Sequence, residues 1–149
     1  MNIVNLFYLL ENCKELPLFQ QVEAVCNIIK DKEIHLYWGD VSLRYSIDYK
    51  AHHNLQIGKS FVKVKNKDGK RENEQENVIL KEIEYHQLIA HIIKSINDIT
   101  FKEDKEVFIE RFIFDYSVDL TMRKHLMSQR LYYKLLEEAC IDFMHNIKK

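Results

Sequence analysis

The stretch LMSQRLYYK, residues 126–134, decides how the fold of this chain is interpreted. Ser128 is a strong helix N-cap residue, because its hydroxyl accepts a hydrogen bond from an amide that has no partner in the first helical turn. Behind the cap, apolar residues recur at three- and four-residue steps, which predicts an amphipathic final helix. The predicted apolar stripe consists of Leu131, Leu135, Leu136, Ala139, Phe143 and Ile147.

A shorter helix is predicted immediately upstream, from Leu120 to Leu126, and Met127 is then almost the whole link between the two helices. Two helices joined by a turn of three or four residues, the second with exposed polar and aromatic side chains near its start, form the helix-turn-helix pattern. This pattern predicts that the final helix lies in a DNA major groove.

Basic and polar residues gather on these two helices. From Asp119 to Leu136 there are four basic residues and one acid, Asp119 itself, although the whole chain has a net charge of -1. A concentrated patch of this kind is typical of a groove binder, in which Gln pairs with adenine and Arg with guanine. Each tyrosine either contacts DNA or packs into the core. The predicted DNA-binding residues are Arg123, Lys124, Ser128, Gln129, Arg130, Tyr132, Tyr133 and Lys134.

Three features follow one another in the second half of the chain. They are a polar lead-in and long helix over 73–99, a helix that contains KEVFIERF at 105–112, and MSQR at 127–130, which opens the last helix. From about Glu72 to the end, this succession resembles the ArpU/RinA family of phage late-gene transcription regulators, whose C-terminal domain is similar to the last region of sigma factors. The resemblance implies action at promoters of late phage genes.

Composition predicts a mainly α fold. The chain has 149 residues and is 46% hydrophobic, enough for one good core, and its three glycines and one proline are too few for a sandwich or barrel built on tight turns. Cys13, Cys26 and Cys140 are widely spaced and match no metal or redox motif, so we expect reduced core thiols and no cofactor or metal.

Residues 1–58 are predicted to form an N-terminal helical region, with helices over 3–10 and 17–30. The aromatic-rich stretch 34–49 fits helix or strand equally, and His52 and His53 are expected in a solvated loop. Residues 59–72 are predicted to be an irregular basic linker or loop, because 59–71 contains six basic residues and one acid. Such a loop either separates two halves or touches phosphates non-specifically.

Residues 73–99 are predicted to form a long helix that begins the C-terminal region, 73–149. Its seam consists of Tyr85, Ile89, Ile92, Ile96 and Ile99. The seam either packs within the domain or supports a homo-oligomer through the 78–99 helix.

A support helix is expected to start near Thr100. Its predicted inner face consists of Val107, Phe108, Phe112, Ile113 and Tyr116, and its predicted solvent side of Glu103, Asp104, Glu106 and Glu110. Three helices are needed here because two short helices bury too little surface by themselves.

We therefore predict a phage or prophage transcription regulator whose helix-turn-helix binds double-stranded promoter DNA. Glu137, Glu138 and Asp142 would be repelled by phosphates, so the alternative is a protein-binding module that contacts RNA polymerase or another regulator without binding DNA. No phosphate loop, nucleophile elbow or metal-spaced cluster occurs, so an enzyme is not expected. No apolar run approaches the ~20 residues of a membrane span and no secretory leader is present, which predicts a cytoplasmic protein.

Overall fold

The computed structural model describes residues 3–30, 45–50, 52–57 and 72–149. Two predictions fall outside the described residues: the conformation of 34–44 and the basic linker or loop at 59–71. Among the described helices, none combines the length and the apolarity needed to cross a membrane.

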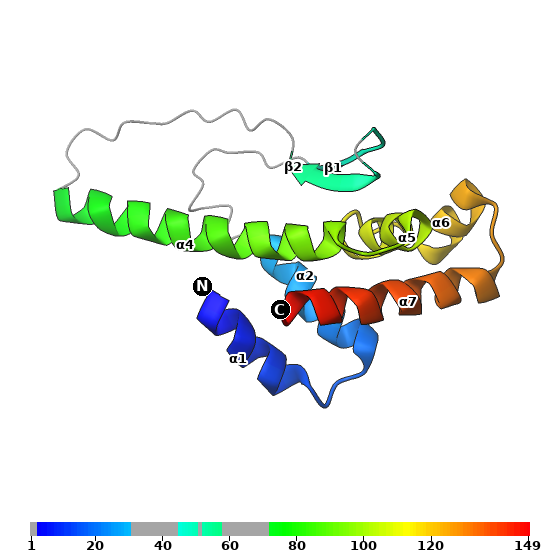
Figure 1. Cartoon of the computed structure of the whole chain (residues 1–149), viewed down its shortest axis with the longest axis horizontal. Helices are drawn as coiled ribbons and strands as arrows, with labels where there is room; N and C mark the ends of the chain where they lie inside the picture. The colour runs from blue at the N-terminus through cyan, green and yellow to red at the C-terminus, as the bar shows by residue number, and fades with distance from the viewer. Residues whose placement is uncertain (1–2, 31–44, 51, 58–71) are drawn as a thin grey trace.

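The described part of the chain is mainly helical, as predicted, with six helices and one small hairpin (Figure 1). In chain order the elements are α1 (Ile3–Cys13), α2 (Leu18–Lys30), β1 (Tyr45–Asp48), β2 (Asn54–Ile57), α4 (Glu72–Asn97), α5 (Lys102–Phe112), α6 (Val118–His125) and α7 (Gln129–Ile147). The two helices expected near the N-terminus are both confirmed. The undecided stretch that ends at Tyr49 contains a strand, β1.

Helix α7 lies at the centre of the packing, against α2, α4 and α5. Figure 1 shows α4 and α7 side by side and running in opposite directions, with the hairpin on the other side of α4. A single cluster of buried side chains draws on α1, α2, β2, α4, α5 and α7. One core therefore joins the N-terminal helices to the C-terminal helices.

The buried face of α7 differs from the predicted stripe at its first turn. Leu131 is 43% exposed, whereas Tyr132 is fully buried. The sequence allows two overlapping apolar stripes on this helix. One begins with Leu131 and Leu135, and the other begins with Tyr132 and Leu136, about 100° around the helix axis. The core contacts the second stripe, and the prediction that Leu131 is buried is wrong. The buried apolar residues of α7 are Tyr132, Leu136, Ala139, Cys140, Phe143, Met144 and Ile147.

The seam of α4 packs within the chain. Ile89, Ile92, Ile96 and Ile99 are each at most 2% exposed, so these four side chains are unavailable for self-association. At the end of α4, the Leu55 amide donates to Asn97 Oδ1 at 2.7 Å and Asn97 Nδ2 donates to the Leu55 carbonyl at 3.0 Å. Asn97 thereby fastens the backbone of β2 to the helix.

The turn of the β1–β2 hairpin is fixed to α5. His52 and His53 have left-handed φ values of 56° and 61°, and these loop residues carry the chain between the antiparallel strands. The buried Lys105 side chain donates to the His52 carbonyl at 3.1 Å and to Asn54 Oδ1 at 2.7 Å. Burial lowers the pKa of Lys105, although the charge of Asp98 opposes that change.

Most of the predicted solvent side of α5 is wrong, because only Glu103 of its four acids is exposed. Asp104, Glu106 and Glu110 are buried, since the hairpin, α6 and α7 all contact this helix. Glu106 Oε1 lies 3.2 Å from His53 Nδ1, without hydrogen-bond geometry. The role of Glu110 bears directly on the candidate site.

Candidate nucleic-acid interface

A tight turn joins α6 to α7, as the sequence predicted. Leu126 is left-handed, with φ 52° and ψ 47°. Its amide donates to the Arg123 carbonyl at 3.4 Å, and the Met127 amide donates to the Met122 carbonyl at 3.0 Å. These two bonds form a Schellman motif, in which glycine usually occupies the left-handed position. A leucine there costs roughly 1–2 kcal/mol in backbone strain.

Each of the two helices begins with a serine cap. The Ser128 hydroxyl accepts a hydrogen bond from the Leu131 amide at 3.2 Å, which confirms the predicted start of α7. Ser117 does the same for α6 through the Leu120 amide at 3.1 Å. The connection is thus only residues 126–128, and both its ends are fixed by hydrogen bonds.

Arg130 and Lys134 lie on one exposed face of α7. They are four residues apart, so they are neighbours on the helix surface. The same face continues with Glu138, with Glu137 beside it, and both acids are exposed. Gln129 is exposed too, but it lies about 100° around the helix from Arg130. The outward face is therefore basic in its first two turns and acidic beyond them.

The position of Arg130 is not explained by helix stability. The first turn of α7 contains no acid, although the helix dipole favours acids there and disfavours cations. In α6 the basic residues Arg123, Lys124 and His125 occupy the last turn, where the dipole favours them. Arg130 adds positive charge to a helix end that is already positive, which suits an external anion.

Lys124 takes part in a structural ion pair. Its Nζ lies 2.5 Å from Oε1 of the fully buried Glu110, and His125 Nε2 lies 2.9 Å from Oε2 of the same carboxylate. Burial alone would lower the pKa of Lys124, but the hydrogen bond and charge of Glu110 outweigh it and raise that pKa. Lys124 is predicted as a DNA-binding cation of the patch, but in the structure it pairs with Glu110, a carboxylate that it shares with His125.

The two tyrosines separate into a core residue and a surface residue. Tyr132 has no exposed surface, and burial raises its pKa, so it cannot belong to a contact surface. Its hydroxyl has no hydrogen-bond partner among the described residues. Tyr133 is 40% exposed, with its ring edge-on to Tyr132 at a centroid distance of 5.1 Å. Tyr133 alone stays in the candidate set.

Arg111 is a basic residue that sequence reasoning missed. It is exposed in the last turn of α5, and its charge opposes the rise in the pKa of Tyr132, which places it near the start of α7. The apolar spacing of α5 predicts a support helix. That spacing does not show that the C-terminal end of α5 lies near α7. Besides Lys124, which is paired with Glu110, the exposed cations around the turn are Arg111, Arg123, Arg130 and Lys134.

No family is identified by comparison. No protein-family model, curated protein or solved structure matches the chain. The ArpU/RinA resemblance stays a prediction, and the interface is argued from its own residues. Within the described ranges, no group of three or more His, Cys, Asp or Glu side chains is arranged to hold a metal ion.

Proposed function

We propose that this protein binds double-stranded DNA through the N-terminal end of α7 and regulates transcription. One observation carries the proposal: Arg130 and Lys134 share an exposed face of a serine-capped helix whose opposite face is held in the core. Neither side chain forms an ion pair with an acid in the described part of the chain. Arg111, Arg123 and Tyr133 would extend the contact to phosphates, and Gln129 and Arg130 would reach base edges.

The acids of α7 restrict how a duplex can be approached. Glu137 and Glu138 lie on the same side as Lys134, so phosphates must stay near the first two turns. We infer that the helix enters the groove end-on, with its N-terminus deepest. Lys134 would then contact the backbone at the groove edge. This geometry favours few base contacts and a modest affinity.

The ArpU/RinA resemblance of residues 72–149 supports the narrower proposal of a phage or prophage regulator at late promoters, acting in the cytoplasm of a bacterial host. That proposal predicts a preference for promoter-proximal phage DNA over random DNA.

A second function, contact with RNA polymerase or another regulator without DNA, is favoured by two exposed leucines, one in the turn and one on α6. Leu126 is 93% exposed and Leu120 is 44% exposed. Apolar side chains at this exposure contribute little to folding, whereas a protein surface could bury them.

Fluorescence anisotropy at low salt, with random and promoter-proximal phage duplexes, tests the two functions. We expect Arg130→Ala and Lys134→Ala to weaken binding several-fold each. Lys148→Ala is the matched control, because it removes an exposed cation at the other end of α7. Absence of binding by the wild-type protein would exclude the DNA proposal. If Lys148→Ala lost as much DNA affinity as the other two variants, the binding would depend on overall charge and not on this face of α7.

A further inference from the structure

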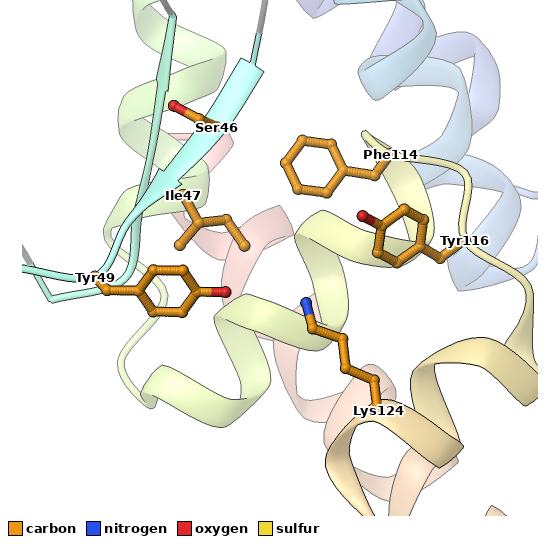
Figure 2. Close-up of a pocket in the computed structure, with 6 residues that line it drawn as sticks. All are labelled: Ser46, Ile47, Tyr49, Phe114, Tyr116 and Lys124. Atoms are coloured by element: carbon orange, nitrogen blue, oxygen red, sulfur yellow. The ribbon is translucent and has the colours of Figure 1, made fainter.

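A shallow cleft, largely open to solvent, lies between the β1–β2 hairpin and the connection from α5 to α6. Its volume is about 540 Å³, within the roughly 300–1,000 Å³ typical of small-molecule sites. Figure 2 shows lining residues from the described part of the chain: Ser46, Ile47, Tyr49, Phe114, Tyr116 and Lys124. They come from the hairpin, the α5–α6 connection and α6, so an occupant would touch three separate segments at once.

Two polar groups of the described lining residues face one space, whereas the Ser46 hydroxyl points away from it (Figure 2). Figure 2 shows the Lys124 ammonium and the Tyr49 hydroxyl pointing toward each other across the cleft. An ammonium has three N–H donors, and Glu110 accepts one of them. Because Glu110 is fully buried, an occupant meets the ammonium and not the carboxylate. The open side of this group therefore suits an anion.

Apart from Ser46 and Lys124, the described lining residues are apolar or aromatic. Ile47 and Phe114 face each other across the cleft (Figure 2). The rings of Phe114 and Tyr116 lie 5.7 Å apart at 46°, and Lys124 Nζ lies 5.7 Å from the centre of the Tyr116 ring. Flat rings stack favourably on such surfaces. The walls thus suit a planar aromatic body with its acidic group toward Lys124.

We propose that this cleft binds a small aromatic carboxylate, with its ring between Ile47 and Phe114 and its carboxylate on Lys124. The proposal does not depend on DNA binding. Lys124 belongs to α6, so the bound carboxylate would connect the hairpin to the helix that leads into the turn. Occupancy would add to the contacts that hold α6 in place.

Titration of the isotope-labelled full chain with 2-naphthoate, followed by amide NMR shifts, tests the proposal. We expect shifts to concentrate at Ser46, Ile47, Tyr116 and Lys124. The neutral amide 2-naphthamide has the same ring without the charge. It should bind about tenfold more weakly, because a charge-assisted hydrogen bond is lost.

Two variants separate binding from folding. Tyr49→Ala removes a wall residue that is 56% exposed, so the fold should persist while the naphthoate affinity falls at least several-fold. Tyr133→Ala, a similarly exposed tyrosine outside the cleft, is the control and should bind as the wild type does. In Lys124→Gln, naphthoate and naphthamide should bind alike. Equal binding of both compounds to the wild type, shifts elsewhere, or no shifts at millimolar concentration would overturn the proposal.

Discussion

Helices α6 and α7 are joined by three residues, yet different forces hold them in place. Helix α7 buries seven apolar side chains in the core. Of α6 only Thr121 is fully buried, and the last turn of α6 is tied down through Glu110. Lys124 on α6 is thus paired within the fold. Arg130 and Lys134 on α7 form no ion pair among the described residues and can contact a partner.

The difference also predicts unequal local stability. Apolar burial in α7 contributes to the global free energy of unfolding. The attachment of α6 depends on one carboxylate and on partly buried Val118 and Met122, so α6 can open without disrupting the core. The following variants change one side of this comparison at a time.

The largest effect is expected in the core face of α7. Phe143→Ala should lower the free energy of unfolding by about 3–5 kcal/mol, because Phe143 is fully buried and packs on Phe108 at a ring distance of 4.9 Å. Leu131→Ala is the matched control in the same helix and should cost less than about 1 kcal/mol. Urea unfolding measures both. Similar losses would contradict the assigned inward face.

The next largest effect is expected in the attachment of α6. Lys124→Ala leaves a buried carboxylate with His125 alone, which should cost about 2–3 kcal/mol. Arg123→Ala, the neighbouring exposed cation, should stay within about 0.5 kcal/mol. Amide hydrogen exchange should show faster exchange of α6 in the Lys124 variant than of α7. Unchanged protection of α6 would show that Glu110 does not hold it.

These contrasts mark what the sequence could and could not reveal. Periodicity and the Ser128 cap predicted the helices and the turn, because those depend on residues close together in the chain, but the Ser117 cap that starts α6 two residues before the predicted Leu120 was not foreseen. Periodicity did not show that Tyr132 replaces Leu131 in the core, since both stripes fit the same spacing. The pairing of Glu110 with Lys124 depends on how α5 and α6 meet, and no local pattern reports that. The burial of Asp104 escaped prediction for the same reason.

Asp104 should produce a smaller, pH-dependent effect. Burial, followed by the charge and hydrogen bond of Glu138 and the charge of Asp142, raises the pKa of Asp104 to about 6. The folded chain therefore binds this proton more tightly than the unfolded chain, and stability falls as pH rises from about 4 to about 6. Asp104→Asn should remove that loss and add on the order of 1–2 kcal/mol at pH 7.

Thermal unfolding of both proteins from pH 4 to pH 8 measures this effect. Glu15→Gln, which changes an exposed acid that does not contribute to the pKa shift of Asp104, is the control and should follow the wild-type curve. A wild-type curve that is no steeper than the Asp104→Asn curve would contradict the assignment.

A small gain is expected at the turn. Leu126→Gly removes the strain of a left-handed leucine and should raise the free energy of unfolding by about 0.5–1 kcal/mol. Leu126 is 93% exposed, so little packing is lost. Chemical unfolding measures the change. A loss of stability would mean that the leucine side chain packs within the protein, and a loss of partner binding in a stabilised variant would assign Leu126 to the contact surface.

Arg130 and Lys134 should have the smallest effect on stability and the most direct effect on function. The measurement that tests the central claim is the salt dependence of DNA affinity for the wild type and for the Arg130→Ala/Lys134→Ala double variant. Each lost phosphate contact should reduce the slope of log K against log salt by about 0.9, with unfolding unchanged. A wild type that fails to bind duplex DNA, or a double variant with the wild-type slope, would contradict the account.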